Sequence, residues 1–181
     1  DTADGITIDL TEPAGSTVSD GTGADISYSG SDTTLSANWA AFTETVSGVQ
    51  KYEYAIGTTS GGTDVVTWAD NDTATSVTKA GLSLTNGIIY YISVRATDNA
   101  GNVATVVTSD GATIDTAAPI AGSVTDSTAA DLDWTGSTSS LTSTWTGFSD
   151  ALSGIQKYEY AIGDTIAGTN VLSWTDNSTT T

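Results

Sequence analysis

The chain contains no cysteine, no methionine and no histidine. Without cysteine it can form neither a disulfide nor a thiolate metal site. Without histidine it has no side chain whose ordinary pKa lies near neutral pH, so acid–base chemistry there would need a group with a shifted pKa. Any metal site in this protein must therefore be built mainly from oxygen atoms.

Basic residues are also scarce. Four Lys and Arg residues stand against 22 Asp and Glu residues, which gives a formal net charge of −18. A phosphate backbone would be repelled by this charge, so nucleic acid is not an expected partner. The acidic excess has two interpretations: solubility of an extended surface protein, which we favour, and binding of cations.

Long apolar runs are missing as well. No run approaches the roughly 18 to 20 residues of a membrane span, so membrane insertion is not expected. No targeting segment is recognisable, as expected of an internal piece of a longer protein. Proline occurs only at Pro13 and Pro119, and an internal repeat relates these two positions.

A ten-residue stretch of the chain occurs twice. Gly48–Gly57 returns as Gly154–Gly163 with one substitution, at an offset of 106 residues (154 − 48 = 106). The same offset relates Pro13 to Pro119, Trp39 to Trp145, Phe42 to Phe148 and Trp68 to Trp174. Self-similarity at a fixed period decides the architecture, and a period of this length is a common domain size.

The repeat sets the expected domain boundaries. Residues 13–118 make one full period, and residues 119–181 are the first part of the next, truncated copy. Residues 1–12 are expected to be the tail of a preceding repeat and a linker, because residues 4–9 align with residues 110–115 at the same offset. The chain therefore looks like a piece of a longer tandem array.

Period-two alternation of apolar residues predicts β-strands. The expected strands are 35–39, 49–56, 65–68, 76–82, 90–97 and 103–114, with a turn at 85–87 and a hairpin loop at 98–102. No stretch has a convincing helical period. About seven short strands per period predict an all-β fold of tandem antiparallel β-sandwich domains, with Trp39 and Trp145 filling the cores.

Some of these residues together resemble the fibronectin type III pattern. The resemblance is carried by Leu35-x-Ala37-x-Trp39, by Tyr52 with its alternating neighbours, and by Leu84-x-x-Gly87-x-x-Tyr90-x-x-x-Val94-x-Ala96. It implies that the Tyr90 hydroxyl bonds back to the backbone of the corner before its strand, above Leu84. The 98–102 loop and the 114–119 junction are similar to the type III-like and bacterial Ig-like repeats of large bacterial surface proteins.

The resemblance implies an extracellular location at the cell surface and a structural role. The chain would form the stalk of an adhesin or the wall of a surface fibre, giving reach and rigidity. Its partners would be neighbouring repeats of the same chain and other chains in a fibre. The 98–102 loop lacks Arg-Gly-Asp, so integrin binding is not implied.

Other functions stay open. The chain could be a spacer module of a secreted polysaccharide hydrolase, or a carbohydrate-binding module in which Trp68 and Trp174 stack on sugars. Enzyme activity is not expected, because paired carboxylates need a cleft and a small sandwich with short loops offers little of one. Asn71 and Asn177 begin glycosylation sequons at equivalent positions of the two copies.

Acidic residues recur near the expected junctions between copies. In a type III topology, the linker before one copy meets the loops at that copy's near end. Asp9 is then expected to face Glu44 and Asp98, and Asp115 to face Asp150. Calcium, which takes 6–8 oxygen ligands, would convert their mutual repulsion into a clamp. Solvated surface acids are the alternative. Further candidate ligands are Asn99, Asn102, backbone carbonyls and water.

The repeat also predicts how fragments of the chain behave. Residues 13–118 should fold alone, whereas residues 119–181 should not, because they lack equivalents of the strand at 90–97 and of the closing strand. The measurement is the amide spectrum of each isolated fragment. Dispersed amide resonances from the second fragment alone would contradict this prediction.

Overall fold

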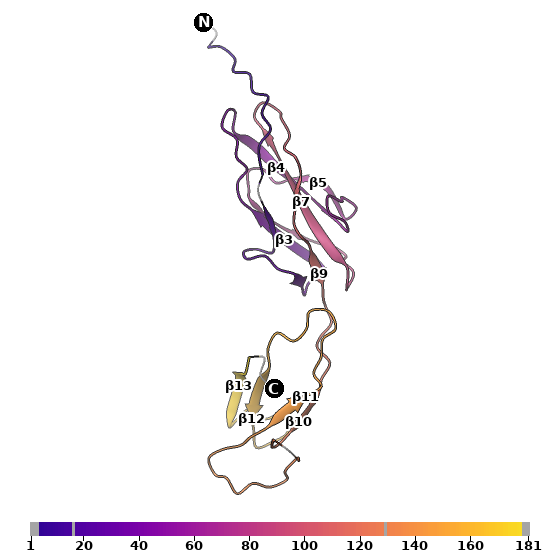
Figure 1. The fold of residues 1–181 in the computed structure, drawn as a ribbon, viewed down its shortest axis with the longest axis vertical. Coiled ribbons are helices and arrows are strands. Elements are labelled where there is room, and N and C mark those ends of the chain that lie inside the picture. Colours follow the sequence, from indigo (N-terminus) through magenta and orange to yellow (C-terminus); the bar gives the residue numbers. More distant parts are fainter. Residues whose placement is uncertain (1–3, 16, 129, 179–181) are drawn as a thin grey trace. The chain divides into compact units, whose positions relative to one another are not determined.

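The computed structural model describes residues 4–15, 17–128 and 130–178, and these form an all-β fold with no helix (Figure 1). Within those ranges, nothing forms a helix long and apolar enough to cross a membrane. The chain divides into two compact units, Asp1–Thr116 and Ala117–Thr181. The described residues 4–12 fall in the first unit, and their assignment to the tail of a preceding repeat and a linker stays a prediction.

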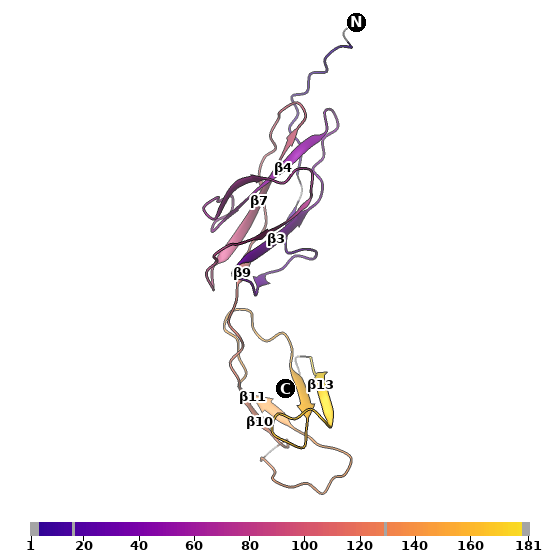
Figure 2. The same cartoon turned by 180° about the vertical axis from the view of Figure 1, so that it is seen from behind.

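The first unit contains two sheets (Figure 2). One has the order β1-β3-β6, and the other has the order β2-β9-β7-β4-β5 with β8 also paired to β7. The strands of the first sheet are β1 (Val18–Asp20), β3 (Thr34–Trp39) and β6 (Ser76–Ala80). Those of the second are β2 (Tyr28–Ser29), β9 (Ala112–Ile114), β7 (Ile89–Asp98), β4 (Val49–Gly57), β5 (Val66–Asp70) and β8 (Val107–Thr108). This arrangement is consistent with a β-sandwich.

The core follows the alternation read in the sequence. Leu35, Ala37 and Trp39 of β3 are buried, and the residues between them are more exposed. The Trp39 and Phe42 rings both meet the Tyr52 ring edge-on, with centroids 5.8 and 5.5 Å apart. Such aromatic pairs add about 0.5–1.5 kcal/mol each beyond the area they bury.

Two buried tyrosine hydroxyls hold backbone in place. The Tyr90 hydroxyl accepts a hydrogen bond from the Thr85 backbone N–H at 3.0 Å, which confirms the expected corner. Leu84 beside it is buried in the same core. The Tyr52 hydroxyl accepts the Phe42 backbone N–H at 3.0 Å, a bond that the sequence analysis missed.

The expected single closing strand over 103–114 is wrong. The segment bridges to β7 at Val103, then pairs with it through β8 and again through β9, and residues 109–111 lie between these two strands. Three residues there face only two residues of β7, because Ser93 pairs with Thr108 whereas Tyr90 pairs with Ala112. This is a β-bulge. Gly111 has φ +95° there, and a Cβ at this position would lie 2.7 Å from the Ile89 side chain.

In its described residues, the second unit contains two strand pairs. They are β10 (Ser123–Thr125) with β11 (Thr144–Thr146), and β12 (Glu159–Ile162) with β13 (Leu172–Asp176). Glu159 pairs with Asp176 as Glu53 pairs with Asp70, at the same offset of 106 residues. Both ladders contain a register shift after the next tyrosine.

The apolar face of the second unit is largely uncovered. Leu141 is 64% exposed, whereas its equivalent Leu35 is 4% exposed. Trp145 is half-buried, with its ring 5.9 Å from Tyr158 and 6.4 Å from Tyr160, so it only partly matches the expected core position. The described residues of this unit include no strand in the place that β7 holds in the first unit, so the layer opposite Trp145 is formed by the β12–β13 pair without a counterpart of β7.

The Tyr90 corner gives a prediction about stability. Tyr90→Phe should lower the free energy of unfolding by about 0.5–1.5 kcal/mol, because the Thr85 N–H loses its partner. Tyr91→Phe on the same strand should be nearly neutral, and thermal melting compares the two variants. Equal shifts in melting temperature would show that the Tyr90 hydroxyl does not hold the corner.

Candidate metal centre

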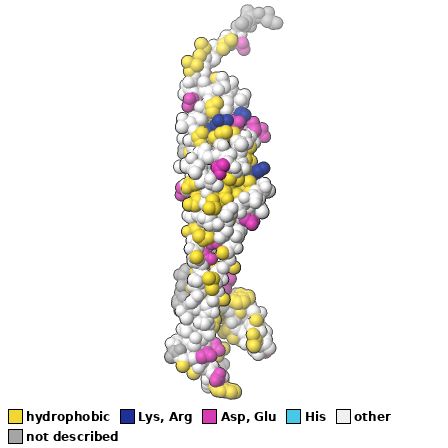
Figure 3. Space-filling view, turned by 90° about the vertical axis from the view of Figure 1, so that its right-hand side faces the viewer, with side chains coloured by type: hydrophobic (Ala, Val, Ile, Leu, Met, Phe, Trp, Pro, Cys, Tyr) yellow, Lys and Arg dark blue, Asp and Glu magenta, His cyan; other side chains and the backbone are white. Residues whose placement is uncertain are grey.

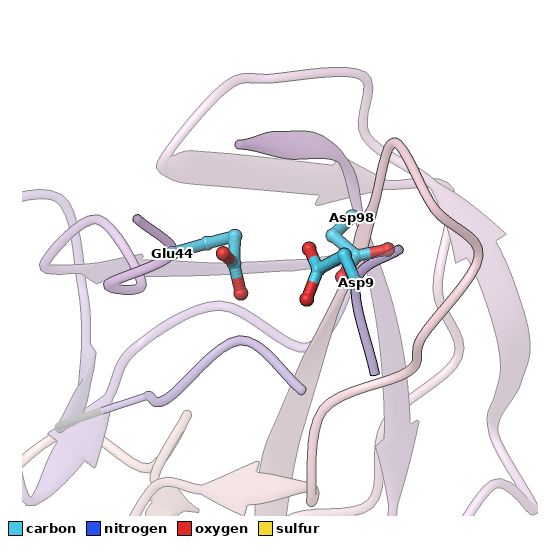
Figure 4. Close-up of side chains that lie close together, drawn as sticks. All are labelled: Asp9, Glu44 and Asp98. Carbon is cyan, nitrogen blue, oxygen red and sulfur yellow. The ribbon is translucent and has the colours of Figure 1, made fainter. Parts of the chain in front are cut away.

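Three carboxylates from distant parts of the sequence meet at one end of the first unit. Asp98 ends β7, Glu44 lies in the loop between β3 and β4, and Asp9 lies in the N-terminal segment. One oxygen atom of each lies within 4.8 Å of the others. Figure 4 shows the carboxylates of Glu44 and Asp9 directed toward one another, with Asp98 beside Asp9. The structure therefore brings together the three acids that the sequence analysis placed at one junction.

Asp98 is fixed by the turn that follows it. Its Oδ1 accepts the backbone N–H groups of Ala100 and Asn102 at 2.9 and 2.8 Å, and its Oδ2 accepts the Asn102 side-chain N–H at 2.8 Å. Burial acts to raise the pKa of Asp98, but these bonds and one from the Gly101 backbone outweigh it and hold that pKa below its ordinary value. Asp98 is therefore charged at neutral pH.

Two asparagines fasten the other two segments to the same turn. Asn102 donates its side-chain N–H to the Asp9 carbonyl at 3.2 Å. Asn99 donates to the carbonyls of Ser47 and Gly48, at 2.8 and 3.1 Å, in the loop that carries Glu44. Both side-chain amide nitrogens are therefore engaged in hydrogen bonds that hold the segments together. Metal ligation by these asparagines would have to use their side-chain carbonyl oxygens.

Asp9 and Glu44 each keep one oxygen without a partner. Asp9 Oδ1 accepts the Thr11 N–H at 2.9 Å, and Glu44 Oε1 accepts the Val46 N–H at 2.6 Å. Asp9 Oδ2 and Glu44 Oε2 are buried and accept no hydrogen bond, and Asp9 as a whole is only 8% exposed. No ion pair joins Lys or Arg to these acids anywhere in the described ranges.

This environment fits a hard cation. Buried carboxylate oxygens without donors are costly, and a positive ion between them removes that cost. Calcium takes 6–8 oxygen ligands at 2.3–2.6 Å in flexible geometry, and it accepts carboxylates, carbonyls and water. Softer metals prefer nitrogen or sulfur ligands, which this chain cannot supply from His or Cys.

The second expected acid pair is divided between the two units. Asp115 follows β9 in the first unit, is buried, and donates its backbone N–H to the Ser29 carbonyl at 2.9 Å. Asp150 lies in the second unit, where its Oδ1 accepts the backbone N–H groups of Leu152, Ser153 and Gly154. Their meeting across the junction stays a prediction.

The two candidate sugar-stacking tryptophans have different surroundings. Trp68 is half-buried, and the Arg95 guanidinium carbon lies 4.3 Å from its ring centroid. Arg95 is held there by Glu53, at 3.0 Å between Nε and Oε2. One face of Trp68 is therefore occupied by a cation. Trp174 is 67% exposed.

The sequon at Asn71 is built into a turn. Its side-chain nitrogen donates to the carbonyls of Ala74 and Ser76 at 2.9 and 3.1 Å, which uses both of its hydrogens. A glycan on this nitrogen would displace one of these bonds. Asn177 donates its backbone N–H to the Tyr158 carbonyl at 2.8 Å, and the last residue of its sequon lies outside the described residues.

A second carboxyl cluster was missed by the sequence analysis. Oxygens of Asp20, Asp25 and Asp110 lie within 4.8 Å of one another near the bulge before β9. A signal was present, because Asp20 and Asp25 recur as Asp126 and Asp131 at the offset of 106 residues.

No protein-family model matches the chain, and no curated protein matches it significantly. The functional argument is therefore made from the geometry of the two units and from the internal repeat.

The candidate metal centre makes a binding prediction. Calcium titrated into the chain should release or absorb measurable heat in a calorimeter, and Asp9→Asn or Glu44→Gln should weaken binding roughly tenfold or more, since ligand charge tunes affinity over such ranges. Glu12→Gln removes the same charge from an exposed position and should leave the affinity unchanged. This centre would be excluded if Asp9→Asn and Glu44→Gln gave the same calcium isotherm as the unsubstituted chain and Glu12→Gln.

Proposed function

We propose that the chain is part of an array of fibronectin type III-like, bacterial Ig-like β-sandwich repeats that forms an extracellular adhesin stalk or surface fibre. Calcium at each junction stiffens the array. The observation that carries this proposal is the approach of the linker residue Asp9 to Glu44 and Asp98, with buried oxygens that no hydrogen-bond donor reaches. The role is mechanical rather than catalytic.

The N-terminal segment supports the array. Its residues Ile6 and Ile8 are 94% and 79% exposed, although they align with Ala112 and Ile114 of β9, which are 1% and 0% exposed. Hydrophobic side chains stand at the surface of this end of the chain (Figure 3). Two apolar residues that match a buried closing strand are accounted for if a preceding repeat covers them.

The shared local geometry of the two units also supports repetition. An isolated bridge joins Ala14 to Thr43 in the first unit, and Ile120 to Ser149 at the same offset in the second. Identical pairing of equivalent residues is expected when one supersecondary unit is repeated along a chain.

Reach and stiffness follow from the dimensions of such a repeat. β7 contains 10 residues, which at about 3.3 Å per residue gives each sandwich roughly 30 Å of length. Repeats joined end to end add this length linearly. A cation that ties a linker carboxylate to two loops of the next repeat removes bending freedom at the hinge, and the array then holds its extension.

A carbohydrate-binding role is the second candidate, and exposed Trp174 favours it. An aromatic ring open to solvent offers a flat apolar surface to the face of a sugar ring. A glycan array probed with the chain and with Trp174→Ala separates this role from the structural one. Glycan binding that disappears in the variant would favour the carbohydrate role.

Small-angle X-ray scattering of the 181-residue chain tests the stalk. Calcium should lengthen its maximum dimension and raise its melting temperature relative to chelator, because a clamped junction bends less. Asp115→Ala at the junction should abolish the lengthening, and Glu12→Gln should preserve it. Identical scattering profiles in calcium and in chelator would leave the acids with a solubilising role only.

A further inference from the structure

The second carboxyl cluster lies where the two sheets of the first unit are joined. Asp20 ends β1 in one sheet, and Asp110 lies in the bulge between β8 and β9 of the other. Asp25 comes from the loop that follows β1. Asp20 is only 2% exposed, whereas Asp25 and Asp110 are exposed.

Asp20 fastens β1 to the bulge. Its Oδ2 accepts the Gly111 backbone N–H at 3.0 Å, and its carboxyl group is hydrogen-bonded to the Ser109 side chain. Ser109 Oγ in turn accepts the Ile92 backbone N–H at 3.0 Å, so its hydroxyl hydrogen points to Asp20. Asp25 Oδ1 accepts the backbone N–H of Asp20 at 2.7 Å. A continuous set of hydrogen bonds therefore runs from β7 through Asp20 to the loop after β1.

No positive charge compensates this cluster. Among the described residues, Lys51 forms ion pairs with Glu53 and Asp70. Arg95 pairs with Glu53, and Lys157 pairs with Glu159. The remaining basic residue, Lys79, lies on β6 opposite Leu35 of β3, and no ion pair joins it to this cluster.

The elements packed around Asp20 add only two further acids. Asp25 faces Asp20 from the loop after β1, and Asp110 faces it from the bulge. On β3 its pairing partner is Ala37, which is uncharged. On β7 the Tyr91 ring lies against Gly111, the residue whose backbone N–H is donated to Asp20.

We propose that this corner is a proton-operated latch, in which Asp20 holds β1 against the bulge before β9 most firmly when it is protonated, and in which its ionisation beside two other carboxyl groups loosens the corner. The proton removes a buried charge that has no cation beside it. This inference goes beyond the proposed function, because it concerns a proton rather than calcium and is tested in the absence of calcium.

The direction of the pH dependence follows from the surroundings of Asp20. Burial, with a smaller contribution from the nearby charges of Asp25 and Asp110, raises the pKa of Asp20 to about 6, against the lowering effect of the bonds from Ser109 and Gly111. A carboxyl whose pKa is higher in the folded chain than in the unfolded chain stabilises the fold below its ordinary pKa. That contribution is lost as pH rises through about 6. The corner is therefore firmest in mild acid and loosest at neutral pH.

The same local arrangement recurs in the second unit. Asp131 Oδ1 accepts the backbone N–H of Asp126 at 3.0 Å, as Asp25 does for Asp20. Each repeat of an array would then carry its own latch, so that acidification would stiffen many corners together.

Melting of the whole chain in chelator, from about pH 4.5 to about pH 7.5, tests the latch. Asp20→Asn keeps an amide that donates and accepts hydrogen bonds without charge. It should melt roughly 4–8 °C above the wild type at the upper pH, and this margin should close toward the lower pH. Glu12→Gln, with the same change in charge at an exposed site, should show no such closing margin.

Carboxyl-carbon NMR of the unsubstituted chain provides a readout that does not depend on a variant folding. The Asp20 resonance should titrate near pH 6, and Asp110→Asn should lower that midpoint by removing one neighbouring charge. A midpoint at the ordinary value for aspartate, or a margin between wild type and Asp20→Asn that does not change with pH, would overturn the proposal. The proposal would also be overturned if calcium abolished the difference in melting temperature between wild type and Asp20→Asn, because a metal ion would then compensate the charge of the cluster.

Discussion

The antiparallel pairing of β4 with β7 is the interaction on which the rest of the first unit depends. It runs from Val49 opposite Asp98 to Gly57 opposite Tyr91, the longest ladder in the described part of the chain. It presents a continuous apolar face to β3, and it fixes where the loop after Asp98 begins. The second unit has the counterpart of β4 without a described counterpart of β7, and its Leu141 and Trp145 are more exposed than the equivalent Leu35 and Trp39.

The same ladder creates the candidate metal centre. Because β7 ends beside the start of β4, the turn after Asp98 lies against the loop that carries Glu44, and Asn99 bonds across to Gly48. The bond from Asn102 to the Asp9 carbonyl attaches the N-terminal segment to the same turn. The pairing of β4 with β7 and the hydrogen bonds of two asparagines together bring these three distant segments to one site.

With 22 acids and 4 bases, most carboxylates of this chain have no basic partner, and the first unit holds two groups of three close together. The first unit does so in two ways. At Asp9 and Glu44, buried oxygens lack donors, and this environment suits a metal ion. At Asp20, backbone and hydroxyl donors already occupy the carboxyl group and lower its pKa, but burial beside two other acids raises that pKa more and favours a proton. The difference lies in the donors around each cluster rather than in the number of acids.

The sequence by itself determined the period of 106 residues and the main strands, because alternation and spacing are local properties. Through the resemblance to the type III pattern, the sequence also predicted the Tyr90 corner. It also placed Asp9 with Glu44 and Asp98, through the order of strands that the resemblance implied. Only the tertiary structure decided the bulge at 109–111, since that depends on one extra residue in the register against β7. The bulge in turn brings Asp110 and Gly111 to Asp20. Partners separated by about ninety residues leave no periodic signal, so tertiary packing alone reveals which acids are buried and what surrounds them.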